Sequence, residues 1–483
     1  MNGSHWTLLV VSLDWVIRLG LILRAIMRRL QVGVSLAWMA VILGFPFLGT
    51  GIYLLFGERR LGRMRADRAR ELHEPYASWL AEFRSRYLEA ESRLLPTDLT
   101  MARLVNNGSG QPVLPDNALE LIPGADLFFE RLEADVKAAS RSCHLEFYIW
   151  SAGGRADALH QALAQAAAHG VRCRVLVDAL GSASFLRSPE AAALRSSGVD
   201  LRAALPVNLI QGLFRRLDLR LHRKIVVIDG LVGYTGSQNI ADPRFFKQNS
   251  GVGEWIDAMV RVTGPAVEAL AVTFVEDWEL ETDQGLQSLS ETLVDDIQTR
   301  GSSLVQVIPS GPNLPRDRME TLIIQSIYDA TQEIVLTTPY FVPSESMVEE
   351  LLAAALRGVV VILVVPAKID SKLVNLASRA FQGDLADAGV KLALFEGGLL
   401  HTKSITIDGR RSLFGSLNLD PRSLQLNFEI TLAVYDVSFT KSLRALQQTY
   451  LDRSTLLDLD AWKKRPFLLR FAENSARLLG PVI

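Results

Sequence analysis

Two stretches of the chain carry almost the same pattern: LHRKIVVIDGLVGYTGSQNIADPR at residues 221–244 and LHTKSITIDGRRSLFGSLNLDPR at residues 400–422. Each contains His, one residue, Lys, four residues, Asp, six residues and then Gly-Ser-x-Asn. A single His-x-Lys pair is a weak signal, but chance duplication of the whole pattern is implausible. Two of the seven histidines, His222 and His401, occupy the equivalent positions. The pattern therefore indicates a duplicated unit whose polar residues serve chemistry.

The sequence around each motif repeats as well. Residues 119–150 and 304–343 each read as strand, helix, strand, and Gly-Val pairs then lead into runs of β-branched residues, as in HGVRCRVLVD and RGVVVILVVP. Short apolar runs that alternate with helical stretches are typical of buried parallel strands in an α/β architecture. We therefore expect two α/β domains, residues 116–295 and 296–483, related by pseudo-twofold symmetry.

The composition argues against some classes of partner. The formal net charge is −2 at pH 7, so the chain has no overall basic field to attract a nucleic acid. The two cysteines, Cys143 and Cys173, lack the spacing of metal ligands, which argues against a zinc site. We expect the remaining histidines to be solvated or satisfied in the core, and these are His5, His73, His144, His160 and His169.

The N-terminal residues 1–60 predict a membrane anchor of two transmembrane helices, residues 6–23 and 31–56. The second segment has no charged residue and exceeds the roughly 20 apolar residues that a spanning helix needs. No A-x-A-like site follows the first segment, so a cleaved signal peptide is not expected. Asp14 and Arg18 interrupt the first span at i,i+4 spacing. They either pair with each other or have a function within the membrane.

More basic residues follow the second span than lie in the loop between the two spans. We expect residues 61–115 to form a linker with a charged helix, and the larger excess of arginines after residue 57 predicts cytoplasmic catalytic domains. The loop's arginines, which oppose this orientation, are Arg24, Arg28 and Arg29. The arginines that favour it are Arg59, Arg60, Arg63, Arg65, Arg68 and Arg70.

The repeated string HxKxxxxDxxxxxxGSxN resembles the signature of the phospholipase D superfamily. The resemblance implies that the two half-sites meet at one active site, and that the reaction passes through a covalent phosphohistidine without a metal or other cofactor. By the family's usual assignment, His222 is the nucleophile. His401 protonates the leaving alcohol and then deprotonates the incoming one. Histidine suits both roles because its pKa lies near neutrality. The sequence leaves the reverse assignment open.

The other motif residues complete the expected site. His and Lys two positions apart in an extended segment point to the same face, and the resemblance implies that Lys224 and Lys403 neutralise the phosphoryl oxygens. Phosphate-binding hydrogen bonds in the transition state are expected from Ser237, Asn239, Ser416 and Asn418. Asp229 and Asp408 belong to the catalytic motif, but they lie too far along their strands to orient the histidines. They are expected to fix the Asp-Gly turns.

Each histidine should be oriented through its other ring nitrogen by a carboxylate. Asp257 in GEWIDAMV and Glu429 in LNFEITLAV both precede β-rich segments, at similar distances past Gly-Ser-x-Asn. Glu254 is an alternative to Asp257. We favour Asp257 because the matching acidic residue of the family precedes the strand.

Strings outside the motif resemble bacterial cardiolipin synthases over essentially the whole chain, including GIYLLFGERR, HLEFYIW and VLTTPYFVPSESM. This resemblance implies transfer between two phosphatidylglycerol molecules, giving cardiolipin and glycerol, by a multi-pass protein of the cell inner membrane. The open alternatives are a phospholipase D that releases phosphatidic acid, a transferase that uses phosphatidylethanolamine or makes phosphatidylserine, and a membrane-tethered nuclease. The sequence does not indicate the oligomeric state.

The C-terminal residues 461–483, AWKKRPFLLRFAENSARLLGPVI, combine an amphipathic pattern with basic residues. We expect an interfacial helix that touches anionic lipid. A helix that packs on the second domain is the alternative.

Overall fold

The structure is a computed structural model that describes residues 3–28, 32–57, 63–206, 216–282, 301–313 and 318–478. It divides into two compact units, an anchor unit of residues 1–67 with 207–219, and an α/β unit of residues 68–206 and 220–481. The expected boundaries after residues 60 and 295 lie outside the described residues. The expected boundary at residue 116 falls just inside the first strand, Leu114–Pro123.

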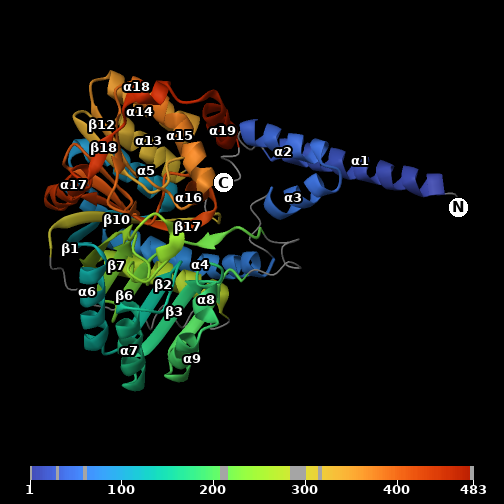
Figure 1. Ribbon diagram of the computed structural model, residues 1–483. Coiled ribbons are helices and arrows are strands. Elements are labelled where there is room, and N and C mark those ends of the chain that lie inside the picture. Colours follow the sequence, from blue (N-terminus) through green and yellow to red (C-terminus); the bar gives the residue numbers. More distant parts are fainter. Residues whose placement is uncertain are drawn as a thin grey trace. The chain divides into compact units, whose positions relative to one another are not determined.

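Both halves of the α/β unit contribute equivalent strands to one sheet (Figure 1). The first half supplies β1 (Leu114–Pro123), β2 (Ser142–Phe147), β3 (Arg172–Asp178), β4 (Asp200–Ala204), β6 (Ile225–Ile228), β7 (Val232–Gly236) and β9 (Ala258–Thr263). The second supplies β10 (Ser303–Ser310), β11 (Glu333–Thr337), β12 (Val360–Pro366), β13 (Lys391–Phe395), β15 (Ser404–Ile407), β16 (Arg411–Gly415) and β17 (Asn427–Tyr435).

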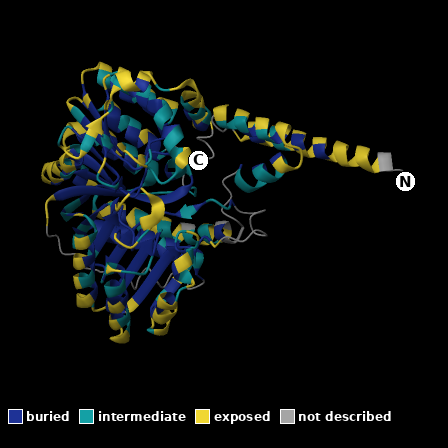
Figure 2. Ribbon diagram, in the orientation of Figure 1, coloured by how far each residue is buried: buried dark blue, intermediate teal, exposed yellow. Residues whose placement is uncertain are grey.

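The strand order confirms the expected duplication. β1 and β10 form an antiparallel pair at the middle of the sheet. Outward from this pair, the order β9-β7-β6-β2-β3-β4 on one side matches β17-β16-β15-β11-β12-β13 on the other, and β18 (Ser454–Leu456) extends the second side. β2-β3-β4 and β11-β12-β13 are parallel, as the continuous apolar runs predict. Most strand residues are buried, whereas β1 is largely half-buried (Figure 2).

Helices pack on the sheet in equivalent places in the two halves. The connecting helices are α6 (Ala125–Ala138), α7 (Arg155–Ala168) and α9 (Pro189–Ser196) in the first half, and α13 (Arg318–Tyr328), α14 (Glu345–Leu356) and α15 (Lys372–Asp387) in the second. Serine caps begin α9, α14 and α15, each accepting a backbone N–H three residues ahead. α11 (Ala266–Glu281) and α17 (Val437–Leu451) each contact the first strand of the other half, β10 and β1.

The expected linker packs on both halves of the α/β unit, because its second helix contacts α13 and β10 of the second half. α4 (Arg63–Arg86) is its charged helix, and α5 (Pro96–Ser109) follows. In the part of α4 that belongs to the α/β unit, the Trp79 indole N–H donates to Glu268 of α11 at 3.0 Å, and the Tyr76 hydroxyl donates to Glu279 at 3.3 Å. These contacts hold α4 against α11, a helix whose residues are nearly all buried.

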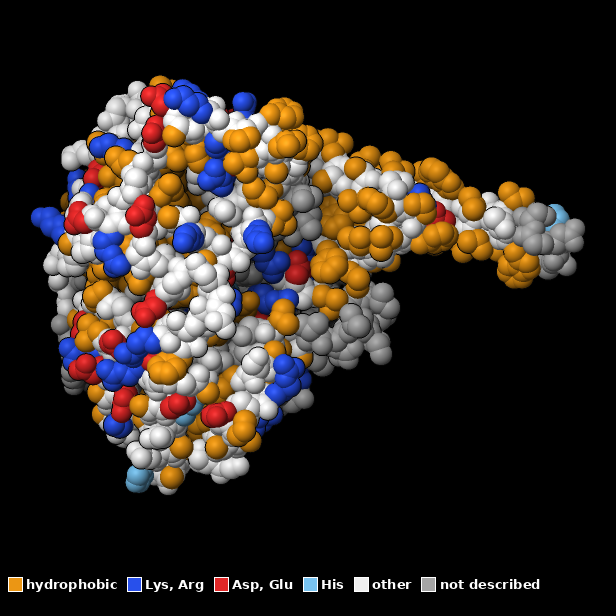
Figure 3. Space-filling model, in the orientation of Figure 1, with side chains coloured by type: hydrophobic (Ala, Val, Ile, Leu, Met, Phe, Trp, Pro, Cys, Tyr) orange, Lys and Arg blue, Asp and Glu red, His pale blue; other side chains and the backbone are white. Residues whose placement is uncertain are grey.

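The anchor unit corrects one expectation. α1 (Gly3–Met27) contains a helix, His5–Met27, that is long and apolar enough to cross a membrane, and its surface is largely hydrophobic (Figure 3). The second expected span is not one helix, because α2 (Val32–Gly44) and α3 (Leu48–Phe56) are separate. Pro46 lacks an N–H and disfavours helix at the residue before it. Phe47 then adopts a left-handed φ of 57°.

Asp14 and Arg18 pair with each other and also bind the broken segment. They form an ion pair in which both side chains are buried. Arg18 Nη1 donates to the carbonyl of Leu43 at 3.2 Å, and the backbone N–H of Phe47 donates to Asp14 Oδ1 at 3.4 Å. The break between α2 and α3 frees backbone groups that have no helical partner. The pair on α1 therefore satisfies backbone groups that the break exposes.

Replacing Arg18 with Met should destabilise the anchor unit, because Asp14 then remains buried without its counter-charge. Breaking a buried ion pair typically costs about 3–5 kcal/mol. We expect a lower thermal unfolding midpoint of the detergent-solubilised full-length protein, and a smaller decrease for Asp14→Leu combined with Arg18→Met. Leu19→Met, at an exposed position of the same helix, is the control. An unchanged midpoint for Arg18→Met would contradict this role.

Candidate active site

Two short parallel strand pairs connect the halves and place the motif histidines. β5 (Arg220–Leu221) pairs with the start of β17, where Leu221 lies opposite Phe428. β14 (Leu399–Leu400) pairs in the same way with β8 (Trp255–Ile256). The next residue is a motif histidine on one strand of each pair and a carboxylate on the other. The register therefore sets each histidine beside a carboxylate from the opposite half.

The side-chain contacts follow this register. His222 Nδ1 lies 2.8 Å from Glu429 Oε2, and His401 Nδ1 lies 2.7 Å from Asp257 Oδ1. The backbone N–H of each histidine donates to the carbonyl of the residue before its partner carboxylate, at 2.9 and 2.8 Å. These are the two carboxylates that the sequence favoured, and the structure exchanges them between the halves. The alternative, Glu254, is exposed.

Both motif lysines are buried within the same cluster. Lys224 Nζ donates to the carbonyl of His222 at 2.7 Å, and Lys403 Nζ donates to the carbonyl of His401 at 2.5 Å. Burial lowers the pKa of Lys224 to about 8, although the nearby carboxylates act to raise it. Burial also holds the pKa of Lys403 well below its ordinary value. The cluster therefore gathers two lysines with lowered pKa values around the histidines.

The protonation states of the histidines and carboxylates are complementary. Burial lowers the pKa of His222 and of His401 to about 4, against the opposing effect of the partner carboxylates. Burial alone would raise the pKa of Glu429 and Asp257, but the neighbouring histidines and lysines hold it below the ordinary value. At pH 7 the rings are neutral and the carboxylates ionised. Nδ1–H then faces the carboxylate and leaves the Nε2 lone pair for chemistry.

The motif serines hold the carboxylates. Ser416 Oγ donates to Glu429 Oε2 at 2.5 Å and accepts the backbone N–H of Ile430 at 3.0 Å. Ser237 Oγ accepts the backbone N–H of Ala258, the residue after the other carboxylate, at 3.1 Å. In this structure the hydroxyls thus orient the groups that orient the histidines. Their expected contact with phosphate stays a prediction.

The motif asparagines offer buried polar groups to a ligand. Asn239 Oδ1 accepts the backbone N–H of Ile149 at 3.0 Å, while its Nδ2 has no hydrogen-bond partner among the described residues. Asn418 is likewise buried, and its Oδ1 has no partner in the described part of the chain. Buried polar atoms without partners are uncommon in proteins. Asn239 Nδ2 is a donor that an anionic substrate can use.

With this geometry established, comparison with known proteins identifies the family. The family model described as "Cardiolipin synthase, PLD-like domain" matches residues 132–278 and 323–449. The chain belongs to this family. Two relatives named cardiolipin synthase A, from Klebsiella pneumoniae subsp. pneumoniae and Escherichia fergusonii, are each 41% identical over 477 residues, covering 98% of this chain and 98% of the relative.

A solved structure supports the fold of this cardiolipin synthase family member. The crystal structure of phosphatidylserine synthase from Haemophilus influenzae Rd KW20 superimposes with a TM-score of 0.58 at 15% identity, covering 80% of this chain and all of that one. At this identity the likeness concerns the fold alone. It confirms the expected duplicated phospholipase D-like architecture.

The residue between His and Lys differs between the two half-sites. Arg223 is fully buried, forms an ion pair with Asp277 of α11, and donates from Nε to the carbonyl of Glu429 at 3.0 Å. The equivalent Thr402 lies with its hydroxyl 3.0 Å from that of Tyr450 of α17. Both residues connect a motif strand to the long helix of its own half. Both also bind a strand of the other half, because the Thr402 hydroxyl donates to the carbonyl of Ile256 at 3.2 Å. Because this position differs between the two motifs, it could not be singled out from the sequence.

Further residues of the site also escaped prediction. Asn427 Nδ2 donates to Glu429 Oε1 at 3.1 Å and so fixes the second oxygen of that carboxylate. The ring centroid of Tyr148 lies 5.0 Å from that of the first motif histidine, and the centroid of Trp255 lies 4.5 Å from that of the second. The position of Trp255 beside Asp257 was visible in the sequence, but its contact with the other half's histidine was not.

The motif aspartates lie apart from the histidines, in equivalent turns. Asp229 and Asp408 both have left-handed φ values, 54° and 52°. Asp229 accepts the backbone N–H groups of residues 140–142 at 2.7–2.8 Å, just before β2. Asp408 accepts those of residues 331–333, just before β11. Although burial acts to raise them, these hydrogen bonds hold the pKa of both carboxyls below the ordinary value.

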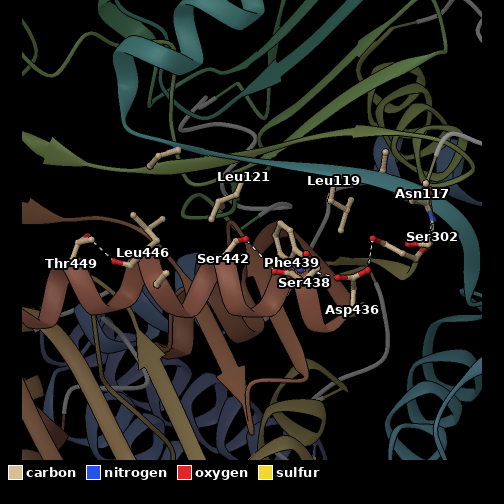
Figure 4. Close-up of a pocket in the computed structure, with 15 residues that line it drawn as sticks. Asn117, Leu119, Leu121, Ser302, Asp436, Ser438, Phe439, Ser442, Leu446 and Thr449 are labelled. Carbon is tan, nitrogen blue, oxygen red and sulfur yellow. Dashed lines mark hydrogen bonds between the residues drawn. The ribbon is translucent and has the colours of Figure 1, made fainter.

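A cavity of about 630 Å³ between β1 and α17 does not coincide with this site (Figure 4). Leu119, Leu121, Phe439 and Leu446 contribute to its apolar lining, and Asp436 lies at one end. None of the motif residues line it. The groups suited to phosphoryl chemistry therefore gather in the buried cluster around the histidines.

Asp229→Asn should lower stability and leave turnover within a few-fold of the wild type. Loss of the charged acceptor for three backbone N–H groups should cost roughly 1–2 kcal/mol of the free energy of unfolding, as for a lost helix cap. Because folding lowers the pKa of Asp229, its contribution is present above the unfolded pKa of about 4 and is lost as pH falls through the folded pKa. Denaturant unfolding in detergent at pH 7 and below pH 4 measures this. Lost turnover at unchanged stability would instead give Asp229 a chemical role.

Glu429→Gln should lower kcat by roughly 10²–10⁴-fold, as removal of the orienting carboxylate does in serine protease triads. Glu429 also raises the pKa of Lys224, so the substitution should move the loss of kcat/KM at alkaline pH to lower pH. Rates measured across pH 5–10 would show both effects. Glu254→Gln, which removes an exposed carboxylate from the same region, is the matched control. A normal rate for Glu429→Gln would contradict the observed pairing as the functional one.

Proposed function

We propose that the protein is a cardiolipin synthase, which transfers the phosphatidyl group of one phosphatidylglycerol to a second and releases glycerol. The exchange of carboxylates between two His-x-Lys half-sites supports this most directly, because it brings both histidines into one cluster. Similarity over 98% of the chain to proteins named cardiolipin synthase A supports the choice of reaction.

In the first step His222 Nε2 attacks the phosphorus of phosphatidylglycerol. The P–N bond forms, the P–O bond to the leaving glycerol breaks, and His401 gives its proton to the glycerol oxygen. An arriving phosphodiester anion favours protonation of one ring, because it adds negative charge beside histidines whose pKa burial has lowered to about 4. Glu429 orients the attacking ring through Nδ1.

In the second step the hydroxyl of another phosphatidylglycerol replaces the histidine. His401 accepts the hydroxyl proton, the new P–O bond forms and the P–N bond breaks. Asp257 keeps His401 in one orientation through both transfers, which lets the same nitrogen act first as an acid and then as a base. The geometry of the two half-sites is nearly equivalent, and the assignment of roles follows the family resemblance.

Lys224 and Lys403 would stabilise the negative charge that grows on the phosphoryl oxygens. Charge-assisted hydrogen bonds are strongest where water is excluded, and both lysine side chains are buried. With a pKa of about 8, Lys224 is charged at neutral pH. Asn239 Nδ2, which lacks a partner in the described structure, would add a further donor.

A phospholipase D would use the same groups with water as the acceptor. The histidines and lysines of this site are at most 7% exposed, and a phosphohistidine formed in so closed a cluster meets little bulk water. A second lipid delivered from the bilayer arrives at high local concentration. Burial therefore favours the transferase over the hydrolase.

The N-terminal anchor and the C-terminal helix also support a location in the cell inner membrane, with the α/β unit on the cytoplasmic side. α1 is apolar enough to cross a bilayer, and arginines follow the anchor. In α19 (Phe467–Leu478), Phe467 and Phe471 are 75% and 62% exposed, whereas Glu473 is buried beside Arg379 at 2.7 Å. A helix that exposes aromatic residues and buries a carboxylate is suited to an interfacial contact with lipid.

Product analysis by mass spectrometry tests the proposed reaction. The purified protein in vesicles of phosphatidylglycerol alone should form cardiolipin and an equal amount of glycerol. Either His222→Ala or His401→Ala should abolish turnover, because nucleophile and acid/base are both required. His169→Ala, at an exposed helix end, is the control.

The outcomes separate the alternatives. Phosphatidic acid without cardiolipin would make water the acceptor and the protein a phospholipase D. Cardiolipin formed only when phosphatidylethanolamine is added would change the donor. Near-normal turnover by His222→Ala would contradict the phosphohistidine mechanism as assigned.

A further inference from the structure

α2 and α3 fold back on each other as a short hairpin. The Trp38 ring of α2 packs edge-on against the Tyr53 ring of α3, with centroids 5.4 Å apart. Nearer the turn, α3 approaches α2 so closely that a Cβ added at Gly49 would lie 2.1 Å from the carbonyl oxygen of Val41. Positions later in α3 thus meet positions earlier in α2, which makes the two helices antiparallel. The end of α3 therefore returns toward the beginning of α2.

The turn of this hairpin lies beside the middle of α1. The helix long enough to cross a membrane is His5–Met27, whose midpoint is Val16. Asp14 and Arg18 lie on either side of that midpoint, and they bind Phe47 N and the Leu43 carbonyl, the backbone groups at the turn. When α1 spans a bilayer, the hairpin turn is consequently near the bilayer centre.

The length of α2 agrees with this depth. Its 13 residues rise about 20 Å, short of the roughly 30 Å of a hydrocarbon core. Non-helical backbone at such a depth is tolerated only where protein groups satisfy it. The buried Asp14–Arg18 pair meets this requirement and explains why a costly ion pair stands in the middle of an apolar helix.

We propose that α2 and α3 form a re-entrant hairpin that enters and leaves the membrane on the same face, so that the chain crosses the bilayer once, through α1. The hairpin's partner is the acyl-chain region of a single leaflet. Exposed apolar side chains suited to that contact are Leu36, Leu43, Phe45, Phe47 and Leu48. The N-terminus then lies on the opposite face from the α/β unit.

A single crossing also resolves the conflict between the two groups of arginines. With two crossings, the arginines after α1 and those after α3 would lie on opposite faces, against the positive-inside rule. With the hairpin, residues 24–29 and 59–70 share one face, and the first five residues contain no Lys or Arg. Every arginine near the anchor's ends then favours the same orientation, with the α/β unit in the cytoplasm. Arg18 does not enter this count, because it lies within the membrane and not at an end of the anchor.

Cysteine labelling of the full-length protein in spheroplasts distinguishes one crossing from two. Ser4→Cys, Met27→Cys and Lys441→Cys place single thiols in the first turn of α1, at its end and on α17. The native Cys143 and Cys173 are buried, so the parent protein supplies the background. An impermeant maleimide should label Ser4→Cys in intact spheroplasts, and label Met27→Cys and Lys441→Cys only after lysis. Turnover of each variant shows that it is folded.

The labelling pattern decides the proposal independently of the enzymatic reaction. Ser4→Cys and Lys441→Cys on one side, with Met27→Cys on the other, would establish two crossings and overturn the hairpin. Labelling of Ser4→Cys on both sides would overturn a single fixed orientation. Lys441→Cys and Met27→Cys both accessible from outside, with Ser4→Cys protected, would support the single crossing and overturn the cytoplasmic placement instead.

Discussion

The parallel pairing of β5 with β17 and of β14 with β8 is the constraint on which the rest of the site depends. Each pair is only two residues long, and each joins one half of the duplicated fold to the other. The register of each pair fixes the residue that follows one strand opposite the residue that follows the other. A histidine and a carboxylate from different halves therefore meet twice. Each motif histidine thus receives its orienting carboxylate from the opposite half.

This exchange makes the site sensitive to the charge balance of the whole interface. His222, Lys224 and Glu429 share one buried region with their counterparts from the other half, so each cation lies near both carboxylates. Burying charges costs several kcal/mol each unless they are compensated. Here the two lysines and the two carboxylates lie close enough to offset one another, and each neutral ring contacts one carboxylate. The same arrangement leaves the rings able to accept a proton when an anionic substrate enters.

The sequence predicted the duplicated fold because the pattern of both motifs and of the surrounding apolar runs depends only on local periodicity. It also selected Asp257 and Glu429, since each lies next to a β-rich segment downstream of its Gly-Ser-x-Asn. The exchange between the halves could not be predicted, because nothing in a linear spacing states which half a strand pairs with. The break at Pro46 was hidden for a different reason. The apolar run continues unchanged through residues 44–48, and hydrophobicity alone does not register a proline turn.

Two equivalent half-sites must still do unequal chemistry, and the structure shows where the equivalence ends. Arg223 places a buried cation against the backbone of Glu429, whereas Thr402 places a neutral hydroxyl at the matching position. Glu429 also receives hydrogen bonds from Asn427 and Ser416, so both of its oxygens are fixed. A carboxylate held this firmly keeps its histidine in one orientation. That suits a nucleophile, whose lone pair must face phosphorus. The histidine that exchanges protons with two successive alcohols has less need of such restraint. The asymmetry around Glu429 is thus consistent with His222 as the attacking residue.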